Sequence, residues 1–130
     1  MDSPFTVDSL DHIVLRVRDL EKSIAFYNMF GGAPAASSGA INTPMALGPA
    51  TRVLLHHEPE YVPDASGQNL QHFALFISTD REIDELVAYM RAHGAEPFDG
   101  PKANGRGWVQ FRVNDPDGNE IELRVTQTGR

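Results

Sequence analysis

The sequence predicts an α+β fold built from two tandem β-α-β-β-β modules. A β-prone stretch with a histidine near its start occurs twice, a helix-like stretch follows each, and each of these ends at glycine. At an offset of about 60 residues His12 aligns with His72, and Gly32 aligns with Gly94 at nearly the same offset. An internal duplication is the simplest explanation of this repeat.

The first module is expected at about residues 8–57. Residues 11–18 alternate between apolar and other side chains, as a strand does, so that His12 and Arg16 share one face. Asp19 occupies a helix N-cap position, and apolar residues at helical spacing continue to Gly31-Gly32. Three short β-prone stretches follow, at roughly 33–38, 41–48 and 51–57.

The second module is expected at about residues 71–126, after a linker at about 58–70. A strand at 71–77 precedes a helix that is capped by Thr79 or Asp80 and closes at His93-Gly94. The later strands are expected at roughly 95–98, 107–114 and 119–126, with a tight turn at 115–119. The whole chain, residues 1–130, is predicted to form a single domain.

The composition excludes several classes of partner. The formal net charge is −7 and the pI is about 5.1, whereas nucleic acids and anionic membranes select basic surfaces. The chain has no cysteine, and no apolar run approaches the roughly 20 residues that cross a bilayer. The N-terminus lacks the pattern of a signal peptide. We therefore expect a soluble, cytoplasmic protein with a small-molecule substrate.

Three residues have the chemistry of metal ligands. His12 and His72 each begin a predicted strand, and Glu122 lies between Ile121 and Leu123 in another. Two imidazoles and a carboxylate suit a divalent transition metal and leave positions open for substrate. Each residue could also be an ordinary side chain with no role in metal binding. A single strand histidine is usually packed or solvated, and Glu122 could face solvent. The recurrence of the histidine in both modules favours the metal site.

The chain resembles the vicinal oxygen chelate superfamily, which includes glyoxalase I, extradiol dioxygenases, fosfomycin-resistance proteins and bleomycin-resistance proteins. The matching motifs are Asp11-His12 with Arg16-Val17 and Asp19-Leu20, then Ser23 and Phe26-Tyr27, and Asp115 to Asn119 followed by Ile121-Glu122-Leu123. The resemblance implies a curved mixed sheet around a metal-binding cavity, with His12, His72 and Glu122 at the ligand positions. It also implies a homodimer.

Four further residues are candidates for this site. Aligning Leu54-Leu55-His56 with Glu120-Ile121-Glu122 makes His56 a fourth ligand or a wall of the pocket, while His57 points to the opposite face and is a candidate for substrate binding. Arg16 could bind an anionic group of a substrate, or could be a strand-end arginine in solvent. Trp108 could line the pocket or belong to the core.

The predicted chemistry is that of a metal-dependent lyase, isomerase or dioxygenase, with a preference for glyoxalase-like reactions. One divalent ion (Fe, Mn, Ni or Zn) would polarise a substrate that binds it through vicinal oxygens. Glu122 could act as the base if it can leave the metal. The alternative is a metal-free protein of the bleomycin-resistance type, which binds or sequesters a small molecule.

Overall fold

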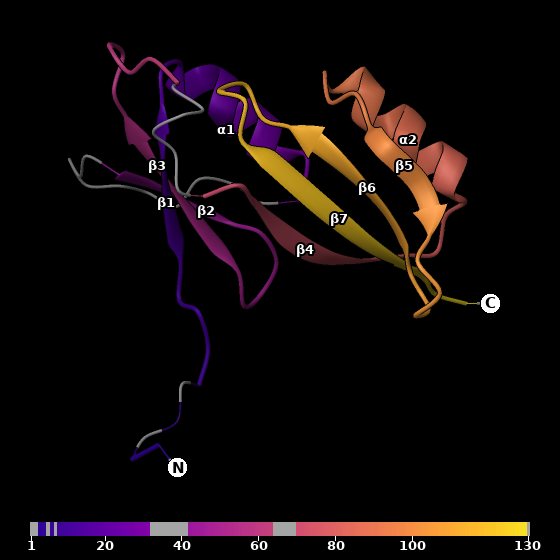
Figure 1. Ribbon diagram of the computed structural model, residues 1–130. Helices are drawn as coiled ribbons and strands as arrows, with labels where there is room; N and C mark the ends of the chain where they lie inside the picture. The colour runs from indigo at the N-terminus through magenta and orange to yellow at the C-terminus, as the bar shows by residue number, and fades with distance from the viewer. Residues whose placement is uncertain (1–2, 5, 7, 32–41, 64–69, 130) are drawn as a thin grey trace.

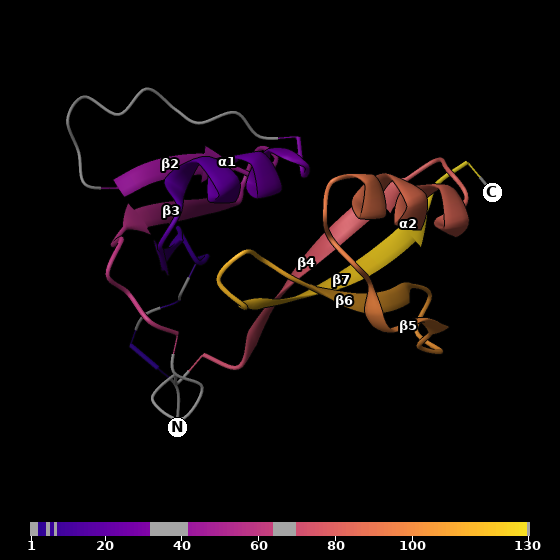
Figure 2. The same ribbon diagram turned by 90° about the horizontal axis from the view of Figure 1, so that it is seen from above.

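The computed structural model describes residues 3–4, 6, 8–31, 42–63 and 70–129 of the chain. It has the predicted α+β architecture of two modules, which Figures 1 and 2 show beside each other. The first contains β1 (Ile13–Val17), α1 (Leu20–Asn28), β2 (Asn42–Ala46) and β3 (Arg52–His57). The second contains β4 (His72–Thr79), α2 (Ile83–Ala92), β5 (Phe98–Ala103), β6 (Val109–Asn114) and β7 (Glu120–Gln127).

Each module has a mixed sheet of its own. The first sheet has the order β1-β3-β2, and the second has the order β4-β7-β6-β5. In both sheets the strand before the helix pairs in parallel with the last strand of the module, β1 with β3 and β4 with β7. The same pairing in both halves supports the duplication that the sequence repeat predicts.

One face of each sheet is apolar and packs into the core. Leu15 and Val17 of β1 and Val53 and Leu55 of β3 are buried, whereas Val14 and Arg16 between them are exposed. The second sheet buries an equivalent set on the same alternation: Phe111, Val113, Ile121, Leu123 and Val125. Burial of one face leaves the other available for polar side chains, and Arg16, His56, His72 and Glu122 lie on these polar faces.

The helices begin and end for recognisable reasons. Asp19 caps α1 as predicted, because its carboxylate accepts a hydrogen bond from the amide of Lys22. Gly31 and Gly94 follow the two helices with φ of +89° and +83°, which glycine adopts without strain. The cap of α2 is Glu82 and not Thr79 or Asp80, because β4 extends through Thr79 and delays the helix.

Two predicted strands do not appear in the described structure at the predicted residues. The stretch predicted as a strand at 95–98 is mostly a connection, and β5 runs over Phe98–Ala103 because it pairs with β6 there. The strand predicted at 33–38 lies outside the described residues, as does Gly32. No helix in the described part of the chain is long and apolar enough to cross a membrane.

The turn between β6 and β7 joins the two modules. Asp115 accepts hydrogen bonds from the amides of Asp117 and Asn119, so the turn closes on itself as its sequence predicts. It also reaches across to the first module, where Tyr27 donates to Asp115 and Arg18 donates to Asp117. Figure 1 shows this turn directed toward α1.

Candidate metal and substrate site

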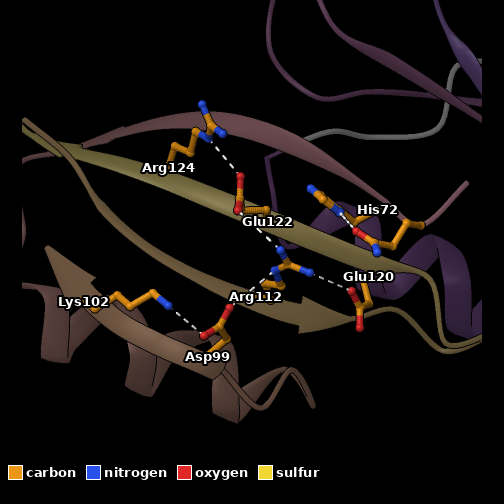
Figure 3. A network of polar contacts seen from close by, with 8 residues as sticks. His72, Asp99, Lys102, Arg112, Glu120, Glu122 and Arg124 are labelled. Carbon is orange, nitrogen blue, oxygen red and sulfur yellow. Dashed lines mark hydrogen bonds and ion pairs between the residues drawn. The ribbon is translucent and has the colours of Figure 1, made fainter. Parts of the chain in front are cut away.

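His72 and Glu122 lie on the same polar face of the second sheet. Strand β4 pairs with β7 so that His72 lies opposite Glu120 and Ala74 lies opposite Glu122. Residues opposite each other in adjacent strands point to the same face, so His72 and Glu122 are diagonal neighbours. Figure 3 shows both side chains on this face.

Glu122 is a buried carboxylate between two arginines. Its side chain is 6% exposed, and its Oε2 accepts a hydrogen bond of 2.9 Å from Nε of Arg124. Nη2 of Arg112 lies 3.8 Å from Oε1. Arg112 also bonds Glu120 at 2.9 Å, and it approaches Asp99, which is paired with Lys102 (Figure 3). The charged groups around Glu122 therefore compensate one another, which permits a carboxylate to be buried.

Both predicted histidine ligands are oriented through Nδ1. His12 bonds Oδ2 of Asp11 at 2.6 Å, and His72 bonds Oε1 of Gln71 at 2.9 Å. Both partner atoms are oxygens that accept hydrogen bonds, so Nδ1 is the donor in each ring. Metal-binding histidines usually have this arrangement, in which an outer oxygen fixes the ring and the free nitrogen faces the metal.

Asp11 also accepts a hydrogen bond from an arginine. Its Oδ1 accepts a hydrogen bond of 2.7 Å from Nη2 of Arg52 on β3. The bonds to His12 and Arg52, together with the positive charge of Arg52, lower the pKa of Asp11, so this carboxylate is ionised near neutral pH. The ionised carboxylate of Asp11 thus holds the ring of His12 in place through Nδ1.

The three predicted ligands do not meet within one chain. His12 precedes β1 in the first sheet, and His72 and Glu122 belong to the second sheet. Within the described ranges, no group of three or more His, Cys, Asp or Glu side chains could hold a metal ion. One copy of the chain thus has its candidate ligands at two separate places, with His12 in the first module and His72 and Glu122 in the second.

The predicted alignment of His56 with Glu122 is wrong by two residues. The register places Leu54 opposite Val14, two residues after His12. It places Glu122 opposite Ala74, two residues after His72. Leu54 is therefore the equivalent of Glu122, and His56 is the equivalent of Arg124. Moreover, the ring nitrogens of His56 contact Asn42 at 2.8 Å and Glu58 at 3.2 Å. Neither nitrogen is free in this arrangement.

The predicted substrate residues lie in different surroundings. Arg16 shares the face of His56, and its Nε lies 3.3 Å from Glu58. His57 is exposed, and strand alternation turns its side chain to the face opposite His56. Trp108 packs edge to face against Phe76, with the ring centroids 5.6 Å apart, on the polar face of the second sheet.

Two arginines of this face were missed from the sequence. Arg112 and Arg124 contact Glu122 from β6 and from β7. The alternation of β7 contains a signal for Arg124, which stands two residues after Glu122 and therefore on its face. Arg112 could be placed only once the pairing of β6 with β7 was known.

A pocket of about 860 Å³ lies between the modules. Its wall includes His12 and the end of α1 from the first module, and β4 with Tyr89 and Met90 of α2 from the second. Neither His72 nor Glu122 lines it. Of the three predicted ligands, only His12 is therefore part of the pocket wall.

Two modules of this topology, with candidate metal ligands in both, define a class of small paired-module α+β proteins. The chain belongs to the Glyoxalase/Bleomycin resistance protein/Dioxygenase superfamily, whose model matches residues 9–123. This confirms the vicinal oxygen chelate resemblance that the motifs indicate.

Curated relatives cover most of the chain. The chain is 30% identical to virulence protein STM3117 of Salmonella typhimurium, over 90% of this chain and 83% of the relative. It is 29% identical to the metallothiol transferase FosB of Lysinibacillus sphaericus, over 92% of this chain and 84% of that protein. It is 27% identical to the glutathione transferase FosA of Serratia marcescens, over 92% of this chain and 82% of that protein.

Solved structures have the same fold. A glyoxalase/dioxygenase from Nostoc punctiforme superposes with a TM-score of 0.75 at 20% identity, covering 97% of this chain and 96% of that one. A mutant of the fosfomycin resistance protein FosX from Listeria monocytogenes, complexed with Mn(II) and 1S,2S-dihydroxypropylphosphonic acid, superposes with a TM-score of 0.71. Its identity is 24%, over 95% of this chain and 94% of that chain.

Proposed function

We propose that the chain is a divalent-metal enzyme whose site is shared between two copies. His12 of one subunit would bind the ion together with His72 and Glu122 of the partner subunit. The observation that carries this proposal is the orientation of both histidines, each with Nδ1 bonded to an oxygen and with Nε2 in contact with no polar group among the described residues. The separation of His12 from the other two residues within one chain is the reason for a shared site.

The contacts of Glu122 fit a metal ligand of which one carboxylate oxygen is bonded to an arginine and the other is left for the ion. In the structure its Oε2 is bonded to Arg124, whereas the nearest cation to Oε1 is Arg112 at the longer distance of 3.8 Å. A metal could therefore approach Oε1 while Arg124 still holds Oε2. Because Arg124 fixes the carboxylate, little reorganisation would be needed on binding.

The edges of the two sheets support a dimer. In the part of the chain that the structure describes, β1 and β4 each pair with a strand on one side only. Large apolar side chains flank these edges in exposed positions: Leu10 and Val14 at β1, and Leu70 and Phe76 at β4. Exposed strand edges with apolar neighbours are surfaces on which another chain can pair. A homodimer in which such edges meet would bring the two sets of ligands together.

The proposed reaction class is that of the superfamily, acting on a small substrate with two adjacent oxygens. Bound Fe, Mn, Ni or Zn would supply Lewis-acid polarisation of those oxygens. His12 and His72 would hold the ion and leave positions open, and Glu122 would be the candidate base. Lyase, isomerase and dioxygenase chemistry all fit this arrangement, and the relatives include transferases and a catechol-2,3-dioxygenase.

Metal analysis tests the metal part of this proposal. The protein is purified without added metal, treated with chelator and dialysed against Mn²⁺, Ni²⁺, Zn²⁺ or, without oxygen, Fe²⁺. We expect one ion per chain in the wild type and a loss of binding in His72→Ala, with the circular dichroism spectrum unchanged. A wild type that retains none of the four ions would favour the metal-free binding protein and refute the enzyme.

Mixed dimers test whether the site is shared. When a His12→Ala chain is paired with a His72→Ala chain, a shared arrangement leaves one intact site, and we expect one ion per dimer. The matched control pairs a wild-type chain with a His12→Ala/His72→Ala double variant, which damages both shared sites, and no ion should bind. A site contained within one chain predicts the reverse result in both experiments. The two chains carry different tags, so that the mixed dimers can be isolated.

A further inference from the structure

Arg124 is held in a fixed orientation beside Glu122. Its Nε donates to Oε2 of Glu122, and its Cζ lies 5.2 Å from the ring centroid of Trp108 and 5.9 Å from that of Phe76. The two rings are themselves in edge-to-face contact. A carboxylate and two aromatic rings thus restrict the guanidinium, which reduces the entropy lost when it binds a further group.

The outer edge of this guanidinium remains available. Its two Nη atoms make no polar contact with any residue that the structure describes, and the side chain is 34% exposed. By contrast, Arg112 on the same face already bonds Glu120 and approaches Asp99 and Glu122. A guanidinium whose Nε is occupied can still offer both Nη groups, and these form a fork that matches an oxyanion.

The charge around Arg124 is balanced, although the chain as a whole is acidic. Three cations of this face each pair with a carboxylate: Lys102 with Asp99, Arg112 with Glu120, and Arg124 with Glu122. The formal net charge of the whole chain is −7. An anion thus meets no excess negative charge from these six groups, and a divalent ion at Glu122 would make the face cationic.

The surroundings of Arg124 also include apolar surface and a spare donor. Phe76, on the edge strand β4 of the second sheet, is 75% exposed and therefore presents apolar ring surface to solvent. Among the described residues, the indole Nε1 of Trp108 is buried without a hydrogen-bond partner. Unsatisfied buried donors are uncommon in folded proteins, and an additional bound group is one explanation of such a donor.

We propose that Arg124, Phe76 and Trp108 form an oxyanion-binding subsite. Its ligand is a small molecule in which a carboxylate, phosphonate or phosphate is attached to a planar apolar group. The oxyanion bonds the two Nη groups of Arg124, and the apolar group packs on the exposed ring of Phe76. The inference deepens the proposed function, since it gives the substrate of that site an anionic end beside Glu122, and it rests on that function for the identity of the reaction.

Tryptophan fluorescence gives a direct measure of this subsite, because Trp108 is the only tryptophan in the sequence. The purified full-length protein is titrated with benzoate and with phenylphosphonate, with excitation at the red edge of the indole band, and binding is confirmed by calorimetry. Acetate lacks the ring and benzyl alcohol lacks the charge. We expect both aromatic oxyanions to bind and to change the fluorescence, and both controls to bind at least tenfold more weakly. The stronger of benzoate and phenylphosphonate identifies the preferred oxyanion.

Substitutions at Arg124 and Phe76 test whether the aromatic oxyanions bind at this subsite. Arg124→Gln should weaken the aromatic oxyanions at least tenfold, and Arg124→Lys, which keeps the charge without the fork, should give an intermediate loss. Phe76→Leu should remove the advantage of benzoate over acetate. The matched control is Arg91→Gln, which removes another arginine that pairs with a glutamate through Nε, on α2. Wild-type affinity in Arg124→Gln, or no binding to the wild type, would overturn the proposal.

Metal measurements separate the two proposals. The titrations are made on chelator-treated and on metal-loaded protein, and metal affinity is measured in each variant. Arg124→Gln should still bind one metal ion per chain, because the metal would approach Oε1 of Glu122 whereas Arg124 bonds Oε2. Oxyanion binding without metal binding would refute the metal function and retain the subsite. Metal binding without oxyanion binding would do the opposite.

Discussion

Tyr27 on α1 donates a hydrogen bond of 2.6 Å to Oδ2 of Asp115, which follows it in the chain by 88 residues. The Tyr27 side chain is fully buried, and Asp115 also accepts three bonds from Asp117 and Asn119 within its own turn. Beside it, Asp117 accepts from the main chain and the guanidinium of Arg18. Buried polar groups thus fix the β6–β7 turn, and with it the start of β7, against the first module.

Removal of the Tyr27 hydroxyl should destabilise the protein. Tyr27→Phe keeps the ring and leaves Asp115 with one buried donor fewer, at a cost of about 1–3 kcal/mol in the free energy of unfolding. Urea unfolding measures the change. Tyr89→Phe, at a half-exposed position on α2, is the control and should change the free energy by less than about 0.5 kcal/mol. Equal effects of the two substitutions would contradict a specific role for the buried bond.

Tyr27 should also make the protein less stable at alkaline pH. Burial raises the pKa of Tyr27 well above its ordinary value of 10.0, and the negative charge of Asp115 raises it further. Above about pH 10 the unfolded chain loses this proton while the folded chain keeps it, so stability falls as pH rises, by up to about 1.4 kcal/mol per unit. Urea unfolding at pH 8 and pH 10.5 should show a smaller fall in Tyr27→Phe. The same fall in both proteins would refute the assignment.

Gly100 on β5 should not tolerate a side chain. Its φ is +135°, and a Cβ there would lie 2.4 Å from the carbonyl oxygen of Gln110 and 3.2 Å from Cβ of Phe111. Gly100→Ala should therefore cost at least about 2 kcal/mol in unfolding free energy. Gly105→Ala is the control, because Gly105 also has a positive φ but open space around it, and it should cost about 1 kcal/mol. A smaller effect at Gly100 than at Gly105 would contradict the close packing of β5 on β6.

The charge of Glu122 should be required for metal binding. Glu122→Gln preserves the shape of the side chain and should weaken Mn²⁺ binding at least about tenfold, since even partners outside the ligand shell cost about 10–100-fold. Calorimetry measures the affinity. The control is Glu120→Gln. Glu120 lies on the same strand and face and pairs with Arg112, but it is not a proposed ligand, so this variant should bind Mn²⁺ nearly as well as the wild type. Comparable losses in both variants would point to a general electrostatic effect.

Metal removal should lower the thermal stability of the protein. An ion that binds the folded state alone adds about 2.7 kcal/mol when its free concentration is about 100 times its dissociation constant. Chelator should therefore lower the melting temperature of the metal-loaded wild type and have no effect on His72→Ala. A chelator effect of equal size in both would show that the ion binds elsewhere.

Local patterns were sufficient for much of the fold. The Asp19 cap, the glycines that follow both helices and the turn at 115–119 depend on residues close together in the chain, and the structure has each of them. The boundary of α2 was missed because it depends on how far β4 continues its pairing with β7, through Thr79 opposite Gln127. The length of this pairing depends on β7, so the residues of α2 alone do not show where the helix begins.

Alternation along the strands determined from sequence which face each site residue occupies. It predicted that His56 and His57 lie on opposite faces, and the register agrees, because side chains point to opposite faces with a period of two. Alternation is unchanged when a strand is shifted by two residues, so it could not distinguish Leu54 from His56 as the equivalent of Glu122. Only the hydrogen-bonded register decided that.

Tertiary structure also decided which groups surround the site. The sequence contained Glu122 and Arg124 at the spacing of one strand face, but Arg112, Phe76 and Trp108 come from other strands or loops and meet them only after the sheet has formed. The bond between Tyr27 and Asp115 is likewise a product of module packing. Contacts between distant segments depend on the relative placement of whole elements, and a pattern within one segment carries no information about that placement.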